Sequence, residues 1–247
     1  MLTLLLLWLP IALPINWLIS DRNLANILTM PILYAEFLLL VVIWGRLVYG
    51  QPNLIKVYGL RQPRKTVLNV LQGLAIGLSS LFAMFIFESL CGWVVWQPQN
   101  NLLQIVLEGG IVAIAYGFAE ELIFRGWLLN ELERGYSAQT ALWTSSIIFA
   151  ALHGFRPQFP ALVILGSILV WAKRSANGRL GIAIGFHAGL IWGYYIVNVG
   201  QIVKFTGRVP AWVTGIDRNP LAGVVAVVAL SAIAIGMRKA AVDRRFS

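Results

Sequence analysis

Charged residues are scarce in this sequence. They make up 12% of the 247 residues, about half of the usual share in a soluble domain, whereas apolar residues make up 59%. A single soluble core cannot hide so much apolar surface, and lipid is the natural solvent for it. The composition therefore predicts an all-α, polytopic membrane protein.

Cysteine is almost absent, since Cys91 is the only one. This excludes an intramolecular disulfide and a metal site built from several cysteines. Acidic residues are also few, which gives a formal net charge of +9. The basic residues lie in short clusters between apolar runs, as expected where loops meet an anionic cytoplasmic leaflet. We therefore expect the lipid bilayer, and not nucleic acid, as a partner.

Long apolar stretches recur along the whole chain. The sixth is short for a straight span, so a re-entrant segment is the alternative there. With eight crossings, most of the 19 Lys and Arg residues fall on one side, and the asymmetry disappears if the sixth stretch does not cross. We predict one membrane domain over residues 1–247, with eight spans and both termini in the cytoplasm. The predicted spans are 2–20, 30–49, 67–95, 103–129, 138–155, 160–172, 180–198 and 219–237.

Acidic residues inside apolar runs are costly and are candidates for function. Three of them, Glu36, Glu88 and Glu108, stand alone, which favours snorkelling, protonation or a bond to a neighbouring helix over chemistry. Glu120 and Glu121 are adjacent. On a helix, Glu121 can pair with Arg125 four residues on, which leaves Glu120 free to face another group. The alternative is a frayed, solvated helix end, but apolar residues on both sides disfavour it.

Both histidines of the chain, His153 and His187, lie in predicted apolar helices. Either alone would indicate a hydrogen-bonded packing residue, but both follow the glutamate pair in the sequence. At a rise of about 1.5 Å per residue, Glu120 and both imidazoles can meet near the cytoplasmic side of the bilayer midplane. Such a set suits hydrolysis. Glu120 can take a proton from water, and the histidines can hold that water, polarise a carbonyl or bind a metal ion.

The order of these residues resembles the CPBP intramembrane proteases, named for CAAX proteases and bacteriocin-processing enzymes and also called the Abi group. The family's motifs are Glu-Glu-x-x-x-Arg, Phe-x-x-x-His and a later His, which Asn or Asp often follows four residues on. This sequence has the motifs in that order over about residues 103–198. They comprise Glu120, Glu121, Arg125, Phe149, His153 and His187.

The resemblance implies an intramembrane endopeptidase that acts on membrane-associated, CAAX-type protein or peptide substrates. We predict Glu120, Glu121, His153 and His187 as catalytic residues, supported by Arg125 and Phe149. If a divalent metal such as zinc is bound, its predicted ligands are Glu120, His153 and His187.

The sequence departs from the family pattern at Ile191, where Asn or Asp often stands. If that polar residue contributes to an oxyanion hole, another group must replace it here. Asn198 is too far along the helix, whereas Tyr194 and Tyr195 are closer to His187. A catalytically silent membrane scaffold or assembly factor is therefore the alternative function. A small transporter would need a polar path and repeat symmetry, and the sequence shows neither.

Overall fold

The computed structural model describes residues 2–20, 22–51 and 53–243. The chain divides by its internal contacts into two compact units, Met1–Val57 and Tyr58–Ser247. Each predicted apolar stretch forms a helix or most of one, so the all-α class is confirmed. The single membrane domain over residues 1–247 stays a prediction.

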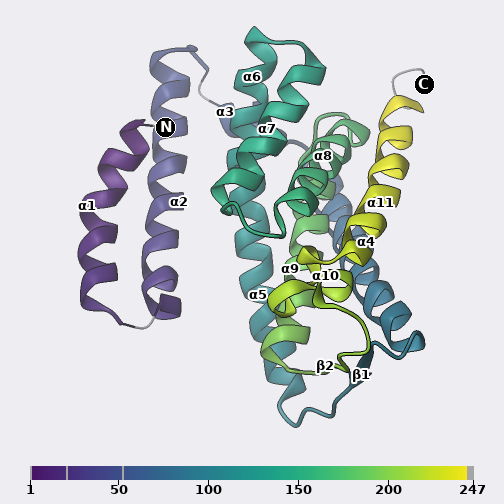
Figure 1. Cartoon of the computed structure of the whole chain (residues 1–247). Coiled ribbons are helices and arrows are strands. Elements are labelled where there is room, and N and C mark those ends of the chain that lie inside the picture. The colour runs from purple at the N-terminus through teal and green to yellow at the C-terminus, as the bar shows by residue number, and fades with distance from the viewer. Residues whose placement is uncertain (1, 21, 52, 244–247) are drawn as a thin grey trace. The chain divides into compact units, whose positions relative to one another are not determined.

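The first unit contains two long helices that pack side by side (Figure 1), α1 (Leu2–Leu18) and α2 (Arg22–Leu47). The indole nitrogen of Trp8 on α1 donates a 3.0 Å hydrogen bond to the carbonyl oxygen of Thr29 on α2. The short helix α3 (Leu54–Val57) ends the unit. Its long helices are largely apolar, which agrees with the predicted first two spans.

The second unit is a bundle of longer helices joined by short elements. The long helices are α4 (Pro63–Leu90), α5 (Leu102–Glu121), α7 (Ala138–Leu152), α8 (Phe159–Ser175), α9 (Gly181–Val199) and α11 (Val224–Asp243). A π-helix, η1 (Leu122–Leu128), and α6 (Leu129–Gly135) continue α5 without a break. The remaining elements are β1 (Val94–Trp96), β2 (Val203–Phe205), α10 (Ala211–Thr214), η2 (Ile216–Arg218) and η3 (Pro220–Ala222).

Length and composition identify the helices that can cross a membrane. Four in the described ranges qualify: Pro63–Leu90, Leu102–Gly135, Gly181–Val199 and Val224–Asp243. Leu6–Leu18 and Ala138–Leu152 are apolar but shorter. The multi-pass membrane class is therefore confirmed, whereas the count of eight crossings and the cytoplasmic termini stay predictions.

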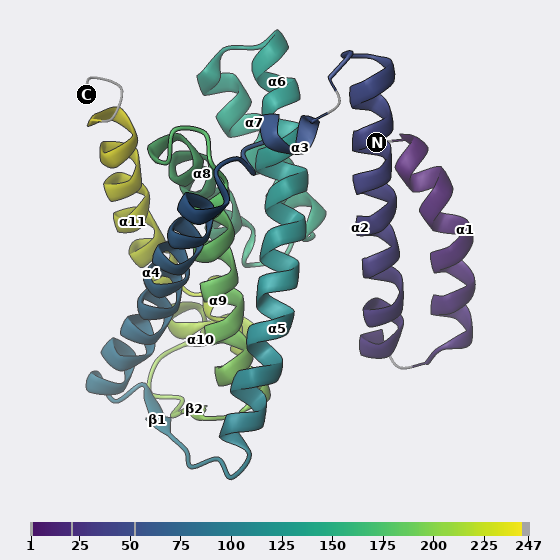
Figure 2. The ribbon, with the colours of Figure 1, turned by 180° about the vertical axis from the view of Figure 1, so that it is seen from behind.

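Helix α9 runs between α4 and α5 (Figure 2), and glycines let their backbones approach closely. A Cβ atom at Gly185 would lie only 2.0 Å from the carbonyl oxygen of Val70, and one at Gly77 only 2.2 Å from that of Phe186. Small residues at such crossings give close van der Waals packing between helices in a membrane. This packing fixes the position of His187 on α9.

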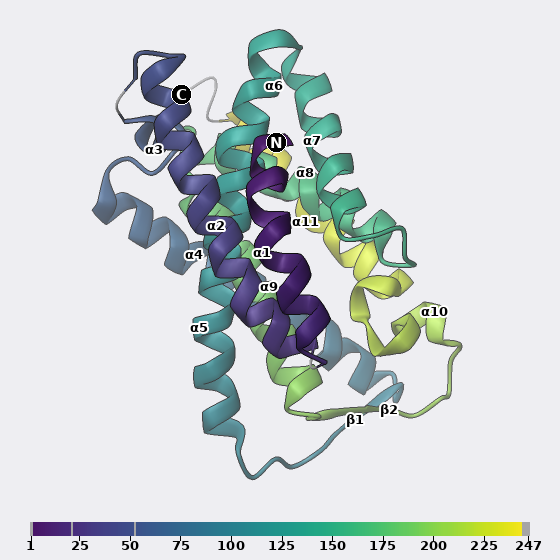
Figure 3. The same cartoon turned by 90° about the vertical axis from the view of Figure 1, so that its left-hand side faces the viewer.

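A small sheet lies at the end of the second unit opposite the α6–α7 turn (Figure 3). Its strands β1 and β2 pair antiparallel, with Val94 opposite Phe205. No sequence pattern predicts this sheet. Both strands are three residues long, which is too short for a periodic pattern to be recognised, and they pair over a separation of about a hundred residues along the chain.

Candidate active site

The glutamate pair lies where the helix changes its geometry. Glu120 and Glu121 are the last residues of α5, and the π-helix η1 begins directly after them. A π-helix is a rare widening of the helical turn that occurs frequently at functional sites. The apolar pattern predicts a helix here but does not distinguish the two geometries.

The carboxylate of Glu121 is tied into a buried network. Its Oε1 atom lies 2.9 Å from the Nη1 atom of Arg125, and the two side chains are 0% and 1% exposed. The same oxygen accepts a 2.9 Å hydrogen bond from the Nδ1 atom of His187. The expected pairing of Glu121 with Arg125 is present, and it also orients the imidazole of His187.

Several groups surround the buried guanidinium of Arg125. Its Nη2 atom donates a 3.2 Å hydrogen bond to the carbonyl oxygen of Gly166 on α8. Its central carbon lies 4.3 Å from the centre of the Phe149 ring, within the range of a cation–π contact. The ammonium group of Lys173 donates a 2.6 Å hydrogen bond to the backbone oxygen of Arg125. Sequence analysis placed Lys173 in a cytoplasmic loop, yet its side chain is buried at the end of α8.

Phe149 lies at the centre of the residues predicted from the motifs. Its ring centre is 4.6 Å from that of His153 and 5.7 Å from that of His187. Its backbone oxygen accepts a 2.8 Å hydrogen bond from the Nδ1 atom of His153. A third ring, that of Phe124, meets it edge to face at 5.1 Å. Phe149 therefore contacts both imidazoles and Arg125.

His153 differs from its prediction in one respect. It was placed inside a helix that continues to residue 155, whereas α7 ends at Leu152 and His153 is the residue that caps it. Gly154 follows with a φ of +91°, a left-handed conformation that ends helices and that glycine adopts without strain. The cap leaves the side chain of His153 31% exposed, compared with 6% for His187.

The two imidazoles and Glu120 converge in spite of their separation in sequence. The Oε2 atom of Glu120 lies 3.6 Å from the Nε2 atom of His153 and 3.9 Å from that of His187. The side chains come from the end of α5, the end of α7 and the middle of α9. The structure thus brings together the three residues that the sequence analysis assigned to one site.

The hydrogen bonds on the far side of each ring define which nitrogen carries the proton. A carbonyl oxygen only accepts, so the Nδ1 atom of His153 must donate to Phe149. The ion-paired carboxylate of Glu121 also accepts, so the Nδ1 atom of His187 donates to it. In the neutral rings, both Nε2 atoms therefore present lone pairs toward the Oε2 atom of Glu120. Within the described ranges, that oxygen is buried and has no hydrogen-bond partner.

Three lone pairs that face one another need a proton, a water molecule or a cation between them. Two ligands of a tetrahedral zinc ion are separated by about 3.4 Å, because each bond is about 2.1 Å long. The distances of 3.6 and 3.9 Å are longer. Among the residues that the structure describes, no group of three His, Cys, Asp or Glu side chains forms a metal site. The zinc ion stays a prediction.

Glu120, His153 and His187 line a cavity of about 210 Å³. Ile191, which stands where the family often has Asn or Asp, lines it too, as does Tyr194. Tyr195 instead packs against Gly109 on α5. Amide side chains also border the cavity, although the sequence analysis did not single them out. They are Gln158 and Asn219.

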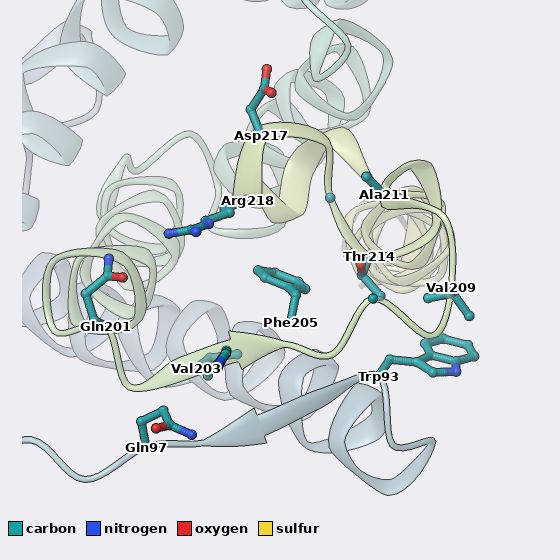
Figure 4. Close-up of a pocket in the computed structure, with 13 residues that line it drawn as sticks. Trp93, Gln97, Gln201, Val203, Phe205, Val209, Ala211, Thr214, Asp217 and Arg218 are labelled. Carbon is teal, nitrogen blue, oxygen red and sulfur yellow. The ribbon is translucent and has the colours of Figure 1, made fainter.

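A larger cavity of about 630 Å³ lies beside the small sheet. Trp93, Gln97 and Phe205 are among the residues that line it (Figure 4). Asp217 is its one carboxylate, and Figure 4 shows that side chain pointing away from the others. The cavity has no histidine in its lining, so the groups for hydrolysis are gathered in the smaller cavity.

The three isolated acids lie outside the cavity that contains Glu120. Glu108 is exposed and accepts a 2.7 Å hydrogen bond from Gln104. Glu88 is completely buried, and neither of its carboxylate oxygens has a hydrogen-bond partner within residues 2–20, 22–51 and 53–243. Glu36 has one buried oxygen without such a partner in the same ranges. None of them adds a carboxylate to the site.

These features define a class: a polytopic helical membrane protein with a glutamate and two histidines around an interior cavity. Residues 102–193 match the family model described as type II CAAX prenyl endopeptidase, Rce1-like. This stretch of the chain is therefore similar to that family, and the resemblance drawn from the motifs is confirmed. Comparisons with curated proteins and with solved structures gave no significant match.

Proposed function

We propose that the protein is an intramembrane endopeptidase that cleaves prenylated, membrane-associated proteins or peptides with a water molecule activated by Glu120. The observation that carries the proposal is the convergence of two imidazole nitrogens, at 3.6 and 3.9 Å, on an otherwise unpartnered carboxylate oxygen. The Rce1-like match over residues 102–193 supports both the reaction and the class of substrate.

A water molecule suits the space between these groups. It has two hydrogens, so it can donate one to Glu120 and one to the Nε2 atom of either histidine. The direct distances of 3.6 and 3.9 Å exceed an ordinary hydrogen bond of about 3.0 Å, which leaves room for bridging. The water's oxygen then directs a lone pair away from the acceptors and toward a substrate carbonyl in the cavity.

The proton transfers follow from this arrangement. Glu120 takes a proton from the water while the water oxygen bonds to the scissile carbonyl carbon. The carbonyl oxygen then becomes negatively charged. Glu120 then gives that proton to the amide nitrogen as the carbon–nitrogen bond breaks. The products are a new carboxyl group and a free amine, and Glu120 is again a carboxylate.

The buried network keeps His187 in the form that this role requires. Because Glu121 accepts the Nδ1 proton, the lone pair of His187 stays on Nε2, on the side of Glu120. The carbonyl oxygen of Phe149 has the same effect on His153. Glu121 and Arg125 are thus positioning residues: they orient an imidazole and do not touch the reacting atoms.

The test is cleavage of an internally quenched peptide that bears an S-farnesyl cysteine followed by three residues, with the protein in proteoliposomes. Glu120→Gln keeps the size of the side chain but removes the proton acceptor, so turnover should fall by at least about a hundredfold, in line with the usual contribution of a general base. Glu108→Gln is the matched control, since it changes an exposed acid of the same helix. Full turnover by Glu120→Gln would overturn the role of Glu120.

A further inference from the structure

A hydrolytic site needs a hydrogen-bond donor for the developing oxyanion. Ile191 lines the cavity where many family members have Asn or Asp, and an isoleucine side chain cannot donate. In the neutral rings the two Nε2 atoms are acceptors, and Glu120 holds the water proton that it passes to the amide nitrogen, so the mechanism leaves the oxyanion without a donor from these three groups. The inference below rests on the proposed function and concerns this missing donor.

We propose that the side-chain amide of Gln158 donates to the oxyanion, and that Asn219 holds it in the required orientation. Gln158 follows His153 by five residues, in the turn between α7 and α8, and it occupies the N-cap position of α8 without a side-chain capping hydrogen bond. Both amides border the cavity that contains Glu120, His153 and His187. The donor therefore comes from the turn that also carries one of the two histidines.

The backbone fixes which way the amide of Asn219 points. Its Oδ1 atom accepts a 3.1 Å hydrogen bond from the backbone N–H of Leu221. A backbone N–H can only donate, so the oxygen of Asn219 must face Leu221, and its NH₂ group must face the other way. That NH₂ group donates to the Oε1 atom of Gln158.

The orientation of Gln158 follows in turn. Because its oxygen accepts from Asn219, its own NH₂ group is directed elsewhere, and in the described part of the chain no residue accepts from that group. Gln158 thus brings a free amide donor to the lining of a cavity whose other polar groups include three acceptors, and an oxyanion requires such a donor. Donors that are positioned before the reaction act most strongly, because they need no reorganisation as charge develops.

Tyr194 also lines this cavity, and its hydroxyl group is an alternative hydrogen-bond donor. Its hydroxyl can rotate, whereas the amide of Gln158 is oriented by the hydrogen bond from Asn219. The geometry therefore favours Gln158, and Tyr194→Phe distinguishes the two experimentally.

The experiment measures kcat and KM for cleavage of the farnesylated quenched peptide in proteoliposomes. Gln158→Leu preserves size but removes the donor, so kcat should fall by about 10²- to 10³-fold, the usual loss for one oxyanion donor. KM should stay within about twofold, because the ground-state carbonyl is bound less strongly than the oxyanion. Gln97→Leu, in the larger cavity of Figure 4, is the matched control and should leave both constants unchanged.

Asn219→Asp tests the orientation itself. The new carboxylate still accepts from Leu221, but it cannot donate to Gln158, so Gln158 turns its NH₂ group to the carboxylate and presents its oxygen to the cavity. Loss of kcat should therefore match that of Gln158→Leu, and the double variant should be little worse, since residues that act as a unit are not additive. A purely structural role for Asn219 would instead lower the melting temperature and leave kcat of the folded fraction intact.

The outcomes separate this inference from the proposed function. If Glu120→Gln is inactive while Gln158→Leu keeps the wild-type kcat, the assignment of Gln158 is overturned and the endopeptidase remains. A hundredfold loss in Tyr194→Phe, without one in Gln158→Leu, would transfer the donor role to Tyr194. If the wild-type protein cleaves no farnesylated peptide of a panel with varied final residues, the proposed function and this inference both fail.

Discussion

Two adjacent glutamates should respond in opposite ways to the same substitution. Glu121→Gln removes the charge that neutralises Arg125, which is 0% exposed. Removal of one partner from a buried ion pair costs about 3–5 kcal/mol, because it leaves a buried charge without compensation. At about 2–4 °C per kcal/mol for a chain of this size, the melting temperature should fall by roughly 6–20 °C.

Glu120→Gln should leave the fold almost intact, because Glu120 lies opposite imidazole nitrogens and pairs with no Lys or Arg side chain in the described part of the chain. The expected cost is below about 1 kcal/mol, the net value of an ordinary hydrogen bond. Thermal unfolding in detergent, followed by tryptophan fluorescence, gives both melting temperatures, and the peptide assay gives both turnovers. Equal losses of stability in the two variants, or an unstable Glu120→Gln that remains active, would refute the division between a catalytic and a positioning glutamate.

Three further predictions test the histidines, the helix packing and the topology. His153→Ala and His187→Ala should each remove most peptide cleavage, and the double variant should be little worse. Additive losses would indicate separate sites. Gly185→Ala should lower the melting temperature by several degrees, because its Cβ would lie 2.0 Å from a backbone oxygen of α4, while Gly236→Ala, with nothing within 4 Å, should not. Single cysteines introduced at Gln99 and in the C-terminal tail of a Cys91→Ala variant should be labelled from opposite sides of the membrane. Labelling of both from one side would contradict eight spans.

Much of the helical architecture could be predicted because the apolar stretches are long and continuous. The predicted span 180–198 and helix α9 (Gly181–Val199) differ by one residue at each end. The ends of helices are predicted less accurately where the conformation of a single residue decides them. The helix that carries His153 stops three residues early because Gly154 adopts a left-handed conformation, which an apolar pattern does not reveal.

The sequence by itself determined the membrane class, the order of the motifs and the choice of Glu120, His153 and His187 as candidates for one site, because composition and motif spacing can be read directly from it. It also indicated that Glu121 pairs with Arg125, since a helix brings residues four apart together. Only the tertiary structure decided what Glu120 faces, which nitrogen of each histidine carries the proton, and that Gln158 and Asn219 border the same cavity. These properties depend on the close packing of α4, α5 and α9, and on contacts between segments far apart in the chain, which no local pattern encodes.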